Sequence, residues 1–267
     1  MASSTRQAMA AAKDALEAHL ADASLKFAEE LFTIGAAVSS STHLRSILSD
    51  PSGEEKAKAG ALQAVFGKNL SSTAVGFAGK LSGMRWSKGS DLAAAFSKLA
   101  VTSVAAMVSK SAKLSDLEQE VFALRQVIDS DRELQQALSS RQASVDSKLA
   151  LIDRITKATF SNEAQLLAHY AVVDSTNSKV SQVLEGYSKQ LAEYAKRLVA
   201  TVTVAAPLSA TQLKKLEELL AKNYGTQLNL NVEIDPSIVG GVKVTVSGEI
   251  IDGSVASRLN QAKLQLA

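Results

Sequence analysis

The chain has 267 residues, of which 46% are hydrophobic, so it can bury a core and has room for two or three small domains. It has no cysteine, which excludes disulfides, zinc–thiolate sites and thiol nucleophiles. The net charge of +2 is spread evenly along the chain, whereas a nucleic-acid-binding protein concentrates Lys and Arg on one surface.

No stretch approaches the ~20 apolar residues that a membrane span needs. The longest candidate, residues 198–208, is interrupted by Thr201 and Pro207. The Ala-rich N-terminus contains Lys13 and Glu17, so it resembles neither a secretory signal nor an acid-poor transit peptide. We therefore expect a soluble protein, in the cytoplasm or on a cytoplasmic face.

From about Thr5 to Arg197 the apolar pattern is that of amphipathic helices. Aromatic residues make up only 4% of the chain and there are three prolines, so long helices rich in Ala and Leu are favoured. One helix face is formed by residues at spacings of three and four, namely Leu25, Ala28, Leu31, Phe32, Gly35 and Val38. Further amphipathic stretches follow at 57–66, 73–84 and 92–108, with short breakers at 50–53 and 87–90.

This helical region predicts an internal duplication. Apolar residues recur at an offset of 90 residues and, after one inserted residue, of 91; the pairs include Phe32 with Phe122, Leu48 with Leu138, and Phe96 with Tyr187. Any two Ala/Leu-rich regions can align by chance, but here the helix lengths and the breaker positions agree as well. We therefore predict two tandem helical bundles, residues 1–108 and 109–197, with the paired residues at equivalent core positions.

Residues 198–267 differ in pattern and predict a small α/β domain in the order strand–helix–strand–strand–helix. The strands are expected at 198–205, 228–234 and 242–246, and the first helix at 209–224. Gly248 then turns the chain and residues 249–251 extend it. A final helix is expected to carry Val255, Leu259, Ala262 and Leu266 on one face. The predicted fold class is therefore mainly α, with two helical bundles followed by this small α/β domain.

The sharpest local signal is the segment 235–244, Asp-Pro-Ser-Ile-Val-Gly-Gly-Val-Lys-Val. Nucleotide fingerprints place spaced glycines between a strand and a helix, whereas this glycine pair leads into another strand. A structural role is therefore favoured over phosphate binding, because glycine allows positive φ and close backbone approach. The residues that we single out are Asp235, Pro236, Gly240, Gly241, Asp252, Gly253 and Ser254.

This C-terminal pattern resembles the signature of the ATP synthase delta subunit family, which includes the mitochondrial oligomycin-sensitivity-conferring protein. The resemblance is dense over residues 199–267, where the Thr-Val-Thr-Val stretch from Thr201 and the Ile-Ile-Asp-Gly-Ser-Val stretch from Ile250 also fit. The helical region resembles the family's N-terminal bundle more loosely. The chain exceeds a typical member by roughly one repeat, as in the extended, actinobacterial type.

The resemblance implies a non-catalytic stator protein. In the family, the helical bundle holds the N-terminal helix of an alpha subunit on the catalytic head, and the C-terminal domain meets the end of the b subunit. We accordingly expect a peripheral protein on the cytoplasmic face of the cell membrane, with the alpha and b subunits as partners. Because of the extra copy, bundle contact residues do not transfer directly, and the first copy is the expected insertion.

Chemical motifs are few. His19, His43 and His169 lie far apart, adjacent acidic pairs diverge on helices, and we expect no catalytic residue, cofactor or metal ion. Trp86, the only tryptophan, is expected to be a packing anchor, with partner contact as the alternative. The rival functions are a generic helical adaptor unrelated to ATP synthase and an enzyme with a catalytic C-terminal domain.

Overall fold

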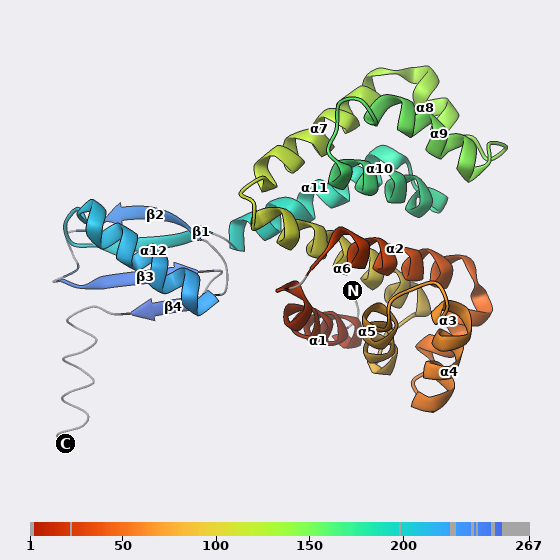
Figure 1. The fold of residues 1–267 in the computed structure, drawn as a ribbon, viewed down its shortest axis with the longest axis horizontal. Helices are drawn as coiled ribbons and strands as arrows, with labels where there is room; N and C mark the ends of the chain where they lie inside the picture. Colours follow the sequence, from red (N-terminus) through yellow and green to blue (C-terminus); the bar gives the residue numbers. More distant parts are fainter. Residues whose placement is uncertain are drawn as a thin grey trace. The chain divides into compact units, whose positions relative to one another are not determined.

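The computed structural model describes residues 3–21, 23–197, 199–224, 228–235, 238, 240–246 and 249–252. The chain divides into two compact units, Met1–Leu191 and Ala192–Ala267. The first is helical and the second is built around a small sheet, so the predicted mainly α fold with a small α/β part is confirmed (Figure 1). The domain boundary predicted between residues 108 and 109 lies inside the first unit and stays a prediction.

The helices of the first unit repeat in order and length. The first six are α1 (Ser3–Leu20), α2 (Leu25–Ser40), α3 (Thr42–Ser49), α4 (Glu55–Phe66), α5 (Ser72–Gly83) and α6 (Gly89–Ser109). They are followed by α7 (Leu114–Ser130), α8 (Arg132–Ser139), α9 (Val145–Thr156), α10 (Asn162–Asp174), the 3-10 turn η1 (Ser175–Asn177) and α11 (Val180–Arg197). From α2 to α5, each helix matches its counterpart in α7 to α10 at an offset of 90 residues, to within one residue at either end. The helix α11 begins 91 residues after α6, as the sequence offset predicts.

A polar contact repeats at the same offset. In the first copy, the backbone N–H and the hydroxyl of Ser71 donate to the Glu30 carboxylate at 2.9 and 2.6 Å. In the second copy, Ser161 donates in the same two ways to Glu120, with an N–H···O distance of 2.9 Å. Each serine also caps the helix that follows it. Because this contact does not depend on the phase of the apolar residues, it is independent support for the duplication.

Two of the three predicted residue pairs occupy equivalent buried positions. Leu48 and Leu138 are both buried, and so are Phe96 and Tyr187. The third pair is wrong as a core pair, because Phe32 is fully buried whereas Phe122 is 46% exposed.

Phe122 is exposed because α2 and α7 carry different residues three positions after the phenylalanine. In α2 this is Gly35, where an added Cβ would lie 2.9 Å from the Phe96 Cβ of α6. In α7 the equivalent residue is Arg125, whose guanidinium lies over the Phe122 ring at 5.4 Å from its centroid. A guanidinium cannot fit into a helix contact of the α2–α6 kind, and over the described residues α11 does not pack closely along α7. Phe122 therefore lacks the cover that α6 gives Phe32.

Phe32 is also covered by the second copy. The ring of Tyr170 stacks on Phe32 with centroids 4.4 Å apart, and Tyr187 lies 6.0 Å away. The Tyr170 hydroxyl lies 2.8 Å from the Thr33 hydroxyl, and Tyr187 donates to the Asp174 carboxylate at 2.8 Å. Burial raises the pKa of Asp174, and the hydrogen bond from Tyr187 opposes that rise. The two copies thus share one aromatic contact, which explains why they form a single compact unit.

Helix α6 is long and apolar enough to cross a membrane by length and composition alone, with a mean hydropathy of 1.6 over its most apolar window. This differs from the sequence expectation that no stretch approaches a span. Within the first unit 67% of that window is buried, where α6 packs against α1, α2 and α3. Its apolar character is therefore accounted for by packing at the centre of the first copy.

The second unit is a four-stranded sheet with one helix described. Its elements are β1 (Val199–Val204), α12 (Ala210–Tyr224), β2 (Asn229–Ile234), β3 (Val242–Val246) and β4 (Glu249–Asp252). The strand order is β2-β1-β3-β4; β2 is parallel to β1, and β3 is antiparallel to both β1 and β4. Residues 249–252 form a fourth strand that pairs antiparallel with β3, at the place where the sequence predicted an extended segment after a turn. The final predicted helix, with Val255 to Leu266, lies outside the described residues.

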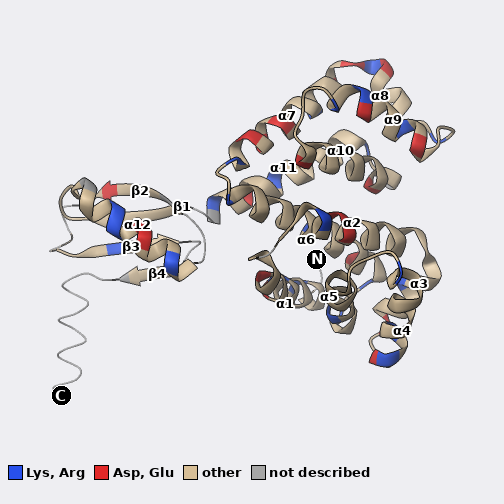
Figure 2. Ribbon diagram, viewed as in Figure 1, with Lys and Arg blue, Asp and Glu red and all other residues tan. Residues whose placement is uncertain are grey.

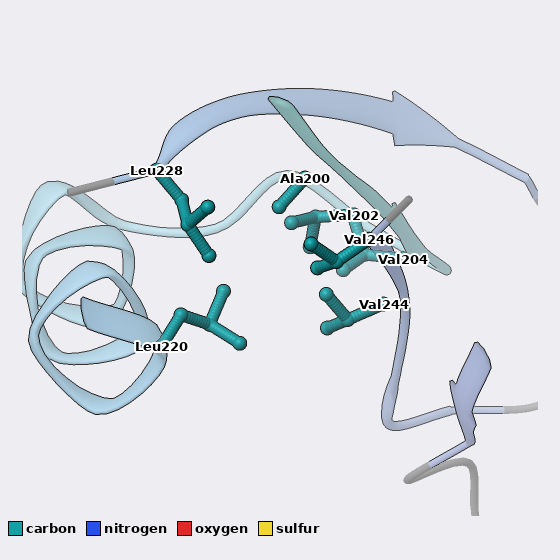
Figure 3. Close-up of a cluster of buried hydrophobic side chains, with 7 residues drawn as sticks. All are labelled: Ala200, Val202, Val204, Leu220, Leu228, Val244 and Val246. Atoms are coloured by element: carbon teal, nitrogen blue, oxygen red, sulfur yellow. The ribbon is translucent and has the colours of Figure 1, made fainter. Parts of the chain in front are cut away.

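The core of the second unit lies between α12 and one face of the sheet. Leu220 of α12 points toward the valines of β1 and β3 (Figure 3). The buried cluster consists of Ala200, Val202, Val204, Leu220, Leu228, Val244 and Val246. Alternate residues of β1 and β3 supply it, which is the period-two pattern of a strand with one buried face.

Candidate functional site

The glycine pair lies in the connection from β2 to β3. The φ angles are 152° at Gly240 and 90° at Gly241, a region that side chains other than glycine rarely adopt. The connection is held at its start by Asp235, whose backbone N–H donates to the Val204 carbonyl at 2.9 Å. Asp252 ends β4 opposite Lys243, whereas Pro236, Gly253 and Ser254 lie outside the described residues. These φ angles support the structural role predicted for the pair.

We expect Gly241→Val to destabilise the second unit by about 1–3 kcal/mol, because a branched side chain is strained at φ 90°. Hydrogen exchange of the β1 and β3 amides in the full chain measures this effect. Gly186→Val is the control, since a Cβ at Gly186 meets no atom within 4 Å. Unchanged exchange in Gly241→Val would show that the connection tolerates any residue.

Trp86 is buried, with 5% of its surface exposed. Its indole N–H donates to the Leu81 carbonyl at 2.8 Å, close to the end of α5. Both observations support the packing role, and contact of Trp86 with a partner stays a prediction.

The three histidines lie in separate environments. His19 packs edge-on against Phe77 with centroids 5.4 Å apart, His43 is exposed, and His169 bonds to Asp153. The described residues contain no group of three or more His, Cys, Asp or Glu side chains that could hold a metal ion. Acidic and basic residues are interspersed over the helices of both copies (Figure 2).

Three glycines lie along the accessible side of α5. Gly76, Gly79 and Gly83 follow one another along the accessible side of this helix, and a Cβ added at any of them would meet no atom within 4 Å. Gly76 and Gly79 lie inside the helix, where each glycine costs roughly 0.5–1 kcal/mol relative to alanine, and Gly83 is its last residue. The packing of the bundle therefore gives no reason for these glycines. Glycine at such positions also allows another backbone to approach closely.

Two cavities open at the two ends of α5. One of about 510 Å³ lies near its start, where Ser71 and Thr73 face Ala18 and His19 of α1. The other, of about 540 Å³, lies near its end and is lined by Ala15, Glu55, Lys58, Ala59, Gly79, Lys80, Gly83 and Met84. We call the glycine face of α5 together with these two cavities the α5 groove. Since α5 has 12 residues, the helix is about 18 Å long, which is roughly three helical turns.

The second copy lacks this groove. At the positions equivalent to Gly76, Gly79 and Gly83 it has Leu166, His169 and Val173, and His169 bonds across to Asp153 of α9. Its helix α10 therefore presents side chains where α5 presents bare backbone. The glycine spacing of three and four was visible in the sequence, but only the structure shows that the space above these glycines is open.

A helical part joined to a small α/β unit, without a metal-binding cluster among the described residues, defines the class of protein on structural grounds. The comparisons with known proteins agree with that class. The family model for the ATP synthase delta (OSCP) subunit matches residues 99–266, from the second half of α6 to the end of the C-terminal unit. Its match leaves out most of the first copy, as expected if that copy is the insertion.

Relatives named ATP synthase subunit delta match the whole of this chain. The chain is 36% identical to ATP synthase subunit delta of Pseudarthrobacter chlorophenolicus and 37% identical to that of Leifsonia xyli, with 100% of both chains covered in each case. It is 34% identical to the subunit of Streptomyces coelicolor, covering 100% of this chain and 98% of that one. The chain therefore belongs to the ATP synthase delta (OSCP) subunit family, whose members are non-catalytic stator subunits. A generic adaptor unrelated to ATP synthase and an enzyme are thereby excluded.

A chain in the cryo-EM structure of the Toxoplasma gondii mitochondrial ATP synthase hexamer is 21% identical, covering 62% of this chain and 94% of that one. The TM-score is 0.30, too low for a comparison of the two folds.

Proposed function

We propose that this chain ties the catalytic head of an F-type ATP synthase to its peripheral stalk on the cytoplasmic face of the cell membrane. The first copy holds the N-terminal helix of an alpha subunit in the α5 groove, and the C-terminal unit binds the end of the b subunit. The observation that carries the first contact is the row of Gly76, Gly79 and Gly83, which the bundle's own packing does not require.

The proposed stator role requires two contacts, one with the catalytic head and one with the peripheral stalk. A rotary motor performs work only if its stator resists torque, so the link must be stiff and must dissociate rarely. An amphipathic helix laid in a groove buries its apolar face and gives one such contact. A second contact through another unit of the same chain makes rebinding intramolecular, so that the pair dissociates far less often than either contact alone.

The second copy has a different role in this proposal. Because α10 carries Leu166, His169 and Val173 in place of the three glycines, the second copy has no equivalent groove. It packs against the first copy through Tyr170 and Tyr187 and leads through α11 toward the C-terminal unit. It therefore serves as a spacer that lengthens the stator.

The test is binding of a synthetic peptide of the alpha subunit's N-terminal segment to the full chain. We expect Gly79→Leu with Gly83→Leu to weaken binding at least about a hundredfold, since two leucines occupy the space a partner helix needs. The fold should survive, because neither side chain meets the bundle's own atoms at Cβ. Gly186→Leu, at another open glycine, is the matched control. Full binding by the double variant would refute the groove assignment.

A further inference from the structure

Lys58 is a buried cation at the end of the α5 groove. It lies on α4 and only 6% of its surface is exposed, although lysine is among the residues least often buried. Its ammonium donates to the Ser82 carbonyl, in the last turn of α5, at 2.8 Å. It also lines the cavity of about 540 Å³, together with Gly79 and Gly83.

The charge of Lys58 is only partly balanced within the chain. An ammonium group has three N–H donors, and the bond to Ser82 is one neutral contact. The hydroxyl and backbone N–H of Ser52 lower the pKa of Asp50, and the charge of Lys58 lowers it further, so this exposed carboxylate lies within electrostatic reach. Glu55 and Lys80, which also line the cavity, have opposite charges. A buried cation is costly unless an anion or several acceptors face it.

The exposed backbone of α5 beside Lys58 allows a partner helix to come close. With no side chain at Gly79 or Gly83, the backbone of a docked helix can approach α5 directly, so a short acidic side chain on it reaches the bottom of the cavity. A carboxylate there would take the free N–H donors of Lys58 in a charge-assisted hydrogen bond, which is about twice as strong as a neutral one.

We propose that Lys58 determines the specificity of the α5 groove by binding an aspartate or glutamate side chain of the docked helix. The inference rests on the proposed function, because it takes the alpha subunit's N-terminal segment as the occupant. It adds the chemistry of recognition: the glycines allow a helix to dock, and Lys58 selects a helix with an acidic residue at the position facing α4.

The duplication supplies a matched control. The residue equivalent to Lys58 in the second copy is Lys148 on α9, at the same offset of 90 residues. It is half-buried, and the neighbouring face of α10 carries His169 and Val173 instead of glycine. Substitution of Lys148 therefore removes the same charge at the equivalent helix position, in the copy that has no glycine face.

The experiment measures the affinity of the full chain for a synthetic peptide of the alpha subunit's N-terminal segment. We expect Lys58→Met to weaken binding about tenfold to a hundredfold, and Lys148→Met to leave it within about twofold. On the unmodified chain, peptides in which one acidic residue at a time is replaced by its amide should identify a single position with a comparable loss. That amide should cause no further loss in Lys58→Met, since both changes remove the same contact.

The outcomes separate this inference from the proposed function. If Lys58→Met binds like the parent while leucines at Gly79 and Gly83 abolish binding, the role of Lys58 is wrong and the groove stands. If the leucines have no effect either, the groove assignment fails as well. The peptides with single acid-to-amide replacements are tested on the unmodified chain. They therefore test the proposed acidic contact even if Lys58→Met does not fold. Equal affinity of all the amide peptides would overturn the inference.

Discussion

Replacement of Gly35 by arginine is expected to destabilise the first copy by more than about 3 kcal/mol. A Cβ at this position would lie 2.9 Å from the Phe96 Cβ, 3.4 Å from the Ala93 carbonyl oxygen and 3.5 Å from the Ser97 backbone nitrogen. Two of these three atoms belong to the backbone of α6 and cannot rotate away. The side chain must therefore push α2 away from α6 at their closest contact.

The reverse change in the second copy is the matched control. We expect Arg125→Gly to change stability by less than about 1.5 kcal/mol, because Arg125 is half-buried in a helix that α11 does not cover closely. Its ion pair with Asp129 is long, at 4.0 Å, and accessible to solvent, so its loss costs little. Urea unfolding of both variants measures the difference. Equal losses in the two variants would show that the close α2–α6 contact is not what distinguishes the copies.

Removal of the C-terminal unit is expected to abolish coupling between proton flow and ATP synthesis. A chain ending at Arg197 keeps the first compact unit up to Leu191 and the whole of α11, and with it the α5 groove. It loses the sheet and α12, which the proposed function assigns to the b subunit. The head should then remain bound to the truncated chain but no longer be held against rotation. ATP hydrolysis should continue without proton pumping.

The measurement uses membranes from a strain that carries only the truncated chain. Proton-driven ATP synthesis should fall to the level of membranes without any copy of the chain, while ATPase activity released from the membrane rises. A chain with Gly186→Ala, a substitution into open space on α11, serves as the control and should support normal synthesis. Normal synthesis with the truncated chain would contradict the assignment of the stalk contact to the C-terminal unit.

Periodicity along the sequence was enough to predict the helical copies and their offset. Helix boundaries follow from capping residues and breakers, which act within a few positions along the chain. This is why α3 and α8, or α4 and α9, begin and end 90 residues apart as predicted. The C-terminal signature likewise gave the resemblance to the family, which the comparisons confirm. Two of its glycines, Gly240 and Gly241, have positive φ, which is a local requirement of the backbone.

Tertiary structure decided which residues of a repeated pattern are covered. Phe32 and Phe122 have the same place in the same helix pattern, yet one is buried and the other is 46% exposed. This difference in burial comes from Gly35 and Arg125. Its cause can be recognised only when it is known which helix packs against each of these residues. The strand β4 is a similar case, because the sequence predicted a turn and an extended segment but not its pairing with β3.

The α5 groove also combines features that the sequence shows with features that only the packing shows. The three glycines of α5, the position of Lys58 on α4 and the larger residues of the second copy can all be read from the sequence. The open space above the glycines and the burial of Lys58 beside them depend instead on how the helices pack. The physical reason is that helix formation depends on neighbours in the sequence, whereas burial and open space depend on neighbours across the fold.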